Sequence, residues 1–262
     1  MLQYPVCHVF SLRDGRRRQI HSYGVACQML PKPQSDLWNA YLELENRGLR
    51  SQRNDALDRF LNAFAELPTS TQREWTIAFA ADVIDAGGKT PVRMPFFRRV
   101  LLPQLQSAIA DRAAGSARWL AGFAQHIYKC TDLRPRLYDG TLTEHGLLLT
   151  ALEHDSNDVA ARRRLLDLLI SRLQYTLHEL PAGVLYSYEG ASIDECRELQ
   201  SELDDFVHHT EALGVTDDYA GLVADCRFHY NTYSKYLADR NGAACYADFL
   251  SQFSDGMSTG SV

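Results

Sequence analysis

The sequence predicts an all-α protein of about ten helices, packed as antiparallel helical hairpins in an irregular α-solenoid or bundle. Three observations predict this fold class. Apolar side chains recur every three to four residues through most of the chain. The connections between these stretches are short, so neighbouring helices run antiparallel. The 262 residues are 45% hydrophobic and 23% charged, a composition typical of folded globular proteins.

The chain divides into three segments by composition. Residues 1–33 form an N-terminal extension, in which Val6–Phe10 and Ile20–Met29 are β-prone and predict a short β-hairpin. Residues 34–253 form the helical domain. The Gly/Ser-rich residues 254–262 are expected to be a disordered tail.

The first helices are bounded by short polar residues, glycines and prolines. Pro31 and Pro33 are expected to stop the extension, and Ser35 to cap a helix that Gly48 closes. The next helix ends before Pro68, and a third ends at Gly87.

The middle of the chain carries three further start signals. Pro103 is expected in the first turn of a helix, where its missing N–H removes no hydrogen bond. Ser116 is expected to start the next helix. Thr143 is expected to begin a short helix that ends at the turn Asp155–Asp158.

The last third of the chain contains the longest helices. Asp158 opens a long helix that Pro181 ends. Ser192 caps an acidic helix that runs to Gly214. The helix after it carries a tyrosine at every third position, Tyr230 to Tyr236, a stripe we interpret as core packing. A short final helix follows.

Charge is distributed unevenly along the sequence. Residues 1–140 carry 19 Lys and Arg against 13 Asp and Glu, whereas residues 141–262 carry 8 against 20. Eleven carboxylates and a single base, Arg197, lie between Glu189 and Asp225. Such a surface repels nucleic acid and attracts cationic proteins. We therefore expect a basic protein partner and no nucleic acid.

The predicted partner-binding residues combine the acidic helix with the aromatic and acidic loop before it. Tyr is favoured at binding hot spots, and clustered carboxylates select a basic partner. The set is Tyr186, Tyr188, Glu189, Glu195, Glu198, Glu202 and Asp205.

A metal site is the weaker interpretation of the same helix. Glu202, Asp205 and His209 share one face, but a facing helix would have to supply further ligands. His178-Glu179 begins like the zinc motif H-E-x-x-H, which needs a second His where Ala182 stands. We interpret His178 as part of a helix C-terminus and predict neither metal nor cofactor.

One stretch has a family resemblance. Ala151–Asp158, followed by Ala161, Leu165 and Leu168, resembles the turn between tetratricopeptide units. That resemblance implies a stack of helical repeats whose groove binds a peptide. A peptide-binding scaffold is therefore one alternative function.

The cysteines and the apolar runs bear on the compartment. Six cysteines without a C-x-x-C pair indicate reduced thiols in a cytoplasm, with Cys7 and Cys27 the first pair to test for a disulfide. The N-terminus does not resemble a secretory signal, and no apolar run is long enough to span a bilayer.

One run of arginines stands early in a predicted helix, and no catalytic motif occurs in the sequence. The early-helix run Arg162–Arg164 is expected to find carboxylates nearby, Asp158 among them. The sequence contains no nucleophile elbow, phosphate loop or dinucleotide fingerprint.

We therefore expect a non-catalytic protein-binding module with an acidic helical face. In charge and class it is similar to bacterial immunity proteins and acidic antitoxins that neutralise a cationic toxin or enzyme. A helical metal-dependent enzyme is the second alternative, beside the peptide-binding scaffold.

Overall fold

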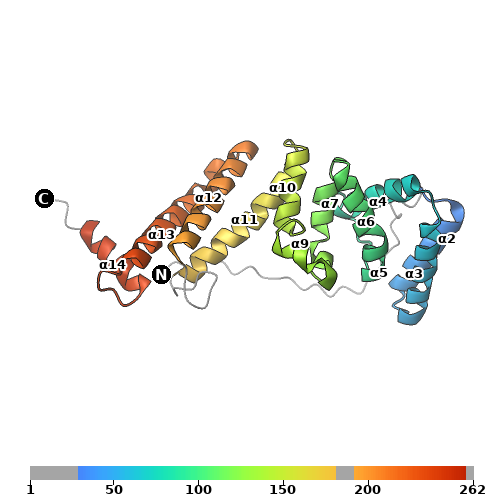
Figure 1. Cartoon of the computed structure of the whole chain (residues 1–262), viewed down its shortest axis with the longest axis horizontal. Helices are drawn as coiled ribbons and strands as arrows, with labels where there is room; N and C mark the ends of the chain where they lie inside the picture. The colour runs from blue at the N-terminus through green and yellow to red at the C-terminus, as the bar shows by residue number, and fades with distance from the viewer. Residues whose placement is uncertain (1–28, 181–191, 258–262) are drawn as a thin grey trace. The chain divides into compact units, whose positions relative to one another are not determined.

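The structure, a computed structural model, describes residues 29–180 and 192–257, with side chains up to residue 252 (Figure 1). The protein is all-α, as expected, and no strand occurs in these two ranges. The predicted N-terminal hairpin and the Cys7–Cys27 pair lie outside the described residues. The described helices group into two compact units, which divide between residues 90 and 91.

The first unit contains α2 (Lys32–Asn46), α3 (Arg50–Ala65) and α4 (Thr69–Ile84). Helices α2 and α3 form an antiparallel hairpin whose connection includes Gly48, at φ +71°, near the predicted end of α2. A largely buried ion pair joins Arg53 of α3 to Glu45 of α2 at 3.3 Å.

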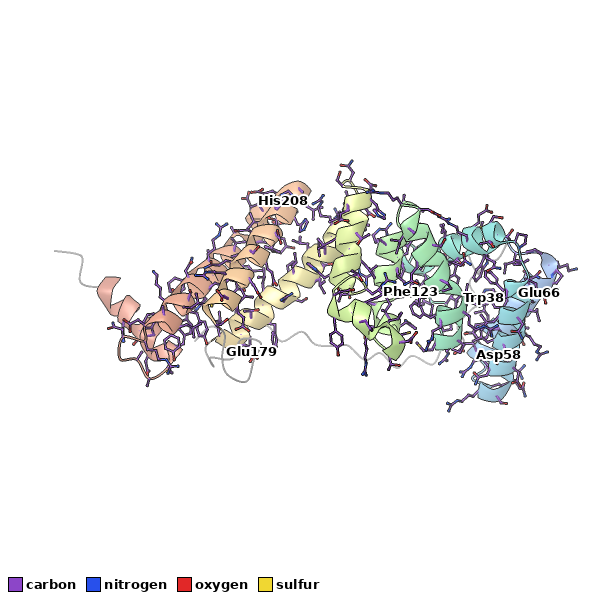
Figure 2. The ribbon with its side chains drawn as sticks, viewed as in Figure 1. Trp38, Asp58, Glu66, Phe123, Glu179 and His208 are labelled. Carbon is purple, nitrogen blue, oxygen red and sulfur yellow. The ribbon has the colours of Figure 1, made fainter. Side chains whose placement is uncertain are left out.

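An aromatic cluster forms the core of the first unit. The ring centroid of Trp38 lies 4.8 Å from that of Phe60 and 5.5 Å from that of Trp75. Phe64 lies 5.1 Å from Trp75, and Phe79 stacks on Trp75 at 5.2 Å. All five side chains are buried, and Figure 2 shows Trp38 in the interior of the unit. Each of the three helices therefore contributes to one apolar core.

The start of α2 corrects one prediction. Pro31 precedes the helix and Pro33 lies in its first turn, so the helix begins before Ser35, which does not cap it. Proline suits this place because the first N–H groups of a helix have no partner within the helix.

The second unit begins with a helical path in three parts. These are α5 (Met94–Phe96), the π-helical turn η1 (Phe97–Leu101) and α6 (Leu102–Ala110). The N–H of Leu102 donates to the carbonyl of Phe97, five residues earlier. Pro103 stands in the first turn of α6, as expected. The wider π turn fits a proline within a continuous helix, because proline supplies no N–H.

Short elements follow and lead to the long helices. They are α7 (Ser116–Gly122), α8 (Ala124–Ile127), the 3₁₀ turn η2 (Thr131–Leu133), α9 (Arg134–Tyr138) and α10 (Glu144–His154). Helix α7 begins at Ser116, as predicted, and packs against α6 and α10. Phe123, between α7 and α8, is buried inside this unit (Figure 2).

The long helices are α11 (Val159–Glu179), α12 (Ile193–Leu213) and α13 (Ala220–Ala238). The 3₁₀ turn η4 (Thr216–Tyr219) precedes α13, and the final helix α14 (Tyr246–Met257) follows it. Helix α10 packs on α11, α11 on α12, and α12 on α13, so that the four lie side by side (Figure 1). The antiparallel pairing of α12 with α13 follows from their short connection, where Gly214 adopts φ +68°.

Three predicted N-caps of this unit are confirmed. Thr143 Oγ1 accepts from the N–H of Gly146 at 3.0 Å, and Asp158 Oδ1 accepts from Ala161 at 2.9 Å. Ser192 forms a capping box with Glu195 at the start of α12. Each side chain binds an N–H that has no partner within its helix.

The tyrosine stripe of α13 is core, as predicted. Tyr230, Tyr233 and Tyr236 are buried, and the ring centroid of Tyr233 lies 4.9 Å from that of Tyr246 in α14. Burial raises the pKa of Tyr246 well above its usual range, with smaller contributions from Tyr233 and Cys196. These rings hold α14 against α13.

Candidate protein-binding surface

Four of the predicted binding residues lie on a single stripe of α12. Glu195, Glu198, Glu202 and Asp205 are three or four residues apart, and His209 continues the series. The other three, Tyr186, Tyr188 and Glu189, lie outside the described residues. The structure therefore positions the helical part of the predicted set.

This stripe meets α11 over a small hollow of about 90 Å³. Arg172 of α11 and Glu195, Glu198, Leu199 and Glu202 of α12 line it. Arg172 Nη2 lies 2.7 Å from Glu202 Oε1. Glu202 Oε2 is buried and has no hydrogen-bond partner among the described residues. Burial raises the pKa of Glu202, opposed by Arg172 and aided by Glu198 and Asp205.

A second polar link joins the same helices near the C-terminal end of α12. Arg162 Nη1 of α11 lies 3.0 Å from Nδ1 of the buried His209, and its Nη2 donates to the carbonyl of Ser156 at 2.7 Å. Burial lowers the pKa of His209, and Arg162 lowers it further. His208, in contrast, is exposed near the end of α12 (Figure 2).

His145 of α10 belongs to this cluster. It is half-buried, and its pKa is lowered first by burial and then by the charge of Arg172, against the opposing effect of Asp205. The stripe of α12 therefore lies within an intramolecular network that involves α10 and α11. Glu202 in particular is paired with an arginine of its own chain and is only partly exposed.

Other acids of α12 also have intramolecular partners. Asp194 pairs with Arg197 one turn away, and Asp204 lies 3.7 Å from Arg227 of α13. The carboxylate of Glu195 accepts from the N–H of Ser192 in the capping box. These groups contribute less net charge to the surface than the sequence alone indicates.

Five further exposed acids lie between the second half of α12 and the second turn of α13. They lack an ion-pair partner within the described ranges, and Arg227, which pairs with Asp204, is the single base between residues 204 and 227. We call this group the acidic hairpin end. It consists of Asp205, Glu211, Asp217, Asp218 and Asp225.

The run Arg162–Arg164 finds a nearby carboxylate, as expected, but the carboxylate is not that of Asp158. Asp158 pairs with Arg118 of α7 at 2.9 Å, while Arg164 pairs with Glu144 of α10 at 2.7 Å. Arg162 binds His209 instead. The arginine run therefore joins α11 to its neighbours rather than offsetting its own helix dipole.

The structure does not assemble a metal site from the acidic helix. Within the described residues, no three His, Cys, Asp or Glu side chains are placed to hold an ion. The Nδ1 of His209 is occupied by Arg162, and Glu202 Oε1 by Arg172. The exposed His178 stands in the last turn of α11, as the interpretation of a helix terminus predicted.

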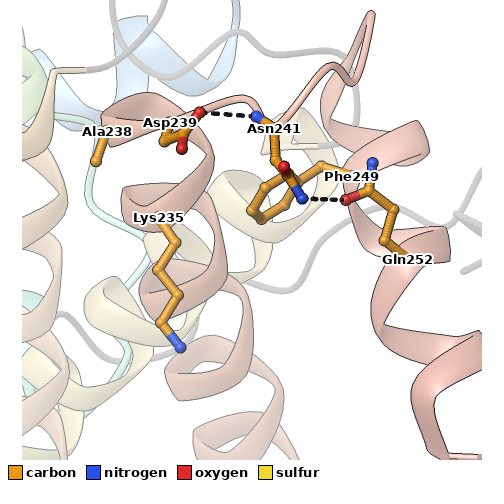
Figure 3. Close-up of a pocket in the computed structure, with 6 residues that line it drawn as sticks. All are labelled: Lys235, Ala238, Asp239, Asn241, Phe249 and Gln252. Carbon is orange, nitrogen blue, oxygen red and sulfur yellow. Dashed lines mark hydrogen bonds between the residues drawn. The ribbon is translucent and has the colours of Figure 1, made fainter.

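A second hollow, of about 530 Å³, lies between α13 and α14. Its lining includes Lys235, Asp239, Asn241, Phe249 and Gln252 (Figure 3). The N–H of Asn241 donates to Asp239 Oδ1 at 2.9 Å, and its Nδ2 donates to Gln252 Oε1 at 3.3 Å. These polar groups hold the loop between the helices and present no nucleophile beside a base.

The buried cysteines are unsuited to nucleophilic chemistry. Burial raises the pKa of Cys196 and of Cys226 to about 11, and Cys130 is shifted upward as well. A thiol with a raised pKa is protonated near neutral pH and reacts slowly.

No helix in the part of the chain that the structure describes is both long and apolar enough to cross a bilayer.

Sequence reasoning missed two residues of the α10–α11–α12 network, His145 and Arg172, and it did not connect Arg162 to His209. Arg162 was visible as part of an arginine run early in a helix, where cations are unfavourable. His145 and Arg172 gave no signal, because their partners are distant in sequence.

Comparisons of the chain with protein-family models, with curated proteins and with solved structures found no match.

Proposed function

We propose that this protein is a non-catalytic binding module that docks a basic protein on the acidic hairpin end. The observation that carries this proposal is the concentration there of five exposed carboxylates without an ion-pair partner in the described ranges. Glu198, also exposed, extends the negative surface along α12 toward its N-terminal end.

The charge balance of the hairpin supports a cationic partner. Residues 192–238 contain ten acids and three bases, a net charge of about −7. Such a field raises the association rate of an oppositely charged protein by roughly ten- to a thousandfold, and salt screens it. It also disfavours nucleic acid, whose phosphates carry the same sign.

One position suggests that the charge serves something other than folding. Glu211 stands in the last turn of α12, where the negative end of the helix dipole disfavours a carboxylate. Asp217 and Asp218 follow six and seven residues later, in η4. A carboxylate in the last turn of a helix weakens the fold, which is consistent with a role of Glu211 in binding.

The finer form of the proposal is an immunity- or antitoxin-type inhibitor of a cationic toxin or enzyme in a bacterial cytoplasm. An acidic protein surface resembles the charge of a nucleic acid and so covers the basic substrate site of a nuclease-like target. The free, buried thiols of Cys130, Cys196 and Cys226 are consistent with a reducing compartment.

A peptide-binding scaffold is the second candidate. The serial packing of α10, α11, α12 and α13 supports it, because stacked helical hairpins form extended binding surfaces. Salt dependence separates the two, since an apolar groove holds its peptide at high salt whereas a charged surface does not.

Charge reversal at the hairpin end tests the proposal. The test variant carries Glu211→Lys, Asp217→Lys and Asp218→Lys. The matched control carries the same charge change at exposed acids of the first unit, Asp55→Lys, Glu66→Lys and Glu74→Lys. The binding partner is first isolated with the wild-type chain from its source cells, and its affinity for each variant is then measured between roughly 0.05 and 0.3 M salt.

We expect a basic partner that loses at least tenfold in affinity for the hairpin variant and little for the control. Circular dichroism verifies that both variants stay folded. A partner that binds the hairpin variant as tightly as the wild type, or binding that does not respond to salt, overturns the proposal.

A further inference from the structure

The contact between α11 and α12 depends on the protonation state of one buried imidazole. Arg162 donates to Nδ1 of His209 over 3.0 Å. A guanidinium has donors and no acceptor, so Nδ1 must carry a free lone pair and His209 must be neutral. Protonation of Nδ1 ends this hydrogen bond and places two cations in contact.

Four groups act on His209, and they come from three helices. Arg162 reaches it from α11 and His145 from α10, while His208 and Asp205 belong to α12 itself. The described residues of α13 and η4 add no charged group to this set. Two of the four are histidines and one is an arginine, so acidification adds positive charge to a site already dominated by Arg162.

We propose that the α11–α12 contact is an acid-sensitive clasp, closed when His209 accepts the hydrogen bond of Arg162 and opened when His209 and His145 are protonated. The ion pair of Arg172 with Glu202 joins the same two helices, and the charge of Arg172 acts on His145. Opening separates the α12–α13 hairpin from the α10–α11 pair. This inference concerns helix packing and holds whether or not the acidic hairpin end binds a partner.

The direction of the effect follows from the two histidines. Each has a lower pKa in the closed clasp than the ordinary value of 6.5. The open state therefore binds protons first, and the clasp is fully closed above about pH 6.5 and loosens as the pH falls below that value. Each unit of pKa difference changes the opening equilibrium up to about tenfold.

Glu202 acts in the opposite direction. Its pKa is raised in the closed state, so the closed clasp binds its proton more tightly than the open one, and acidification toward the ordinary value of 4.5 favours closing. Replacement of Glu202 by glutamine removes this contribution and leaves the histidine response unopposed.

Amide hydrogen exchange of the full-length chain tests the clasp. Exchange at about pH 7.5 and about pH 5.5, corrected for the intrinsic rate, reports the opening of each helix. We expect the peptides of α11 and α12 to open several-fold more at the lower pH. Helices α2, α3 and α4 are an internal control, because residues 29–90 contain no histidine.

Three variants assign the response. His209→Asn offers an amide oxygen near the position of Nδ1 without a titrating group, and we expect it to lose most of the pH response of α12. His145→Asn is the second test should the first variant unfold. His178→Asn, at a side chain that is 83% exposed, is the matched control and should respond like the wild type.

Two outcomes overturn the clasp. One is equal opening of α12 at both pH values in the wild-type chain. The other is a pH response that persists undiminished in both His209→Asn and His145→Asn. Loss of the response in these variants, together with a larger response in Glu202→Gln, supports it.

Discussion

At the scale of single residues, the acids of α12 differ in whether another group of the same chain binds their carboxylates. Asp194, Glu195, Glu202 and Asp204 are bound by groups of the same chain, whereas Asp205 and Glu211 are not ion-paired in the described structure. The sequence shows the number of these charges but not their partners, since pairing depends on helices that are remote along the chain. Glu211 offers the simplest test of what an exposed acid does to stability, because it stands in the last turn of α12 at the negative end of the helix dipole.

We predict that Glu211→Lys stabilises the second unit by about 0.3–1 kcal/mol. A cation in the last turn of α12 interacts favourably with the helix dipole. Urea unfolding at low salt measures the change, and Glu211→Gln should give an intermediate value. A lysine variant no more stable than the wild type contradicts the prediction.

At the scale of elements, the sequence predicted those helix starts that a nearby capping side chain determines. Thr143, Asp158 and Ser192 were recognised as caps because their side chains bind N–H groups three residues further along the chain. The π turn η1 was not predicted, since a wider turn has no composition of its own. The first turn of α2 was missed because proline both ends and begins helices.

The candidate site was predictable to the same degree. The spacing of Glu195, Glu198, Glu202 and Asp205 correctly indicated one stripe of a helix. It did not indicate that the stripe meets Arg172 across the hollow, because no local signal connects residues of two helices. A helical periodicity shows which residues share a face, whereas the neighbouring helix is chosen by the packing of the whole unit.

Two glycines in helices differ in the space around them, so replacing each with alanine should change the stability of the second unit in opposite directions. A Cβ on Gly146 of α10 would lie 2.1 Å from the carbonyl oxygen of Gly140, a backbone atom that cannot move alone. A Cβ on Gly221 of α13 would meet nothing within 4 Å. Gly146 therefore allows the loop before α10 to pack closely on the helix.

We expect Gly146→Ala to destabilise the second unit by roughly 1–3 kcal/mol, because the added methyl group forces the backbone apart. Gly221→Ala should instead stabilise it by up to about 1 kcal/mol, since alanine has the higher helix propensity. Thermal unfolding by circular dichroism compares the two variants. Equal effects at both positions would show that the close approach at Gly140 does not constrain α10.

At the scale of the whole molecule, the division at residues 90 and 91 was not visible in the sequence. The stretch from Gly87 to Pro95 resembles the other connections in glycine and proline content. A unit boundary is defined by the contacts that fail to cross it, and those depend on the fold of both sides. The distribution of histidines, however, differs between the units and makes them separately observable.

The second unit should lose stability below about pH 6.5, whereas the described part of the first should not. His145, His209 and His229 have pKa values below the ordinary 6.5, in each case chiefly because of burial. The unfolded chain therefore binds protons first as the pH falls, so stability is complete above about pH 6.5 and declines below it. Each unit of lowered pKa removes up to about 1.4 kcal/mol, and less at the half-exposed His145 and His229, where solvent screens the charges.

Urea unfolding at about pH 7.5 and about pH 5.5 measures this difference, with hydrogen exchange reporting α2–α4 and α10–α13 separately. His229 lies away from the clasp and hydrogen-bonds Tyr246 at 3.1 Å, so part of the decline should persist in His209→Asn. A fall of equal size in both units would assign the pH dependence to groups other than these histidines. A second unit as stable at pH 5.5 as at pH 7.5 would show that burial does not hold the three imidazoles neutral.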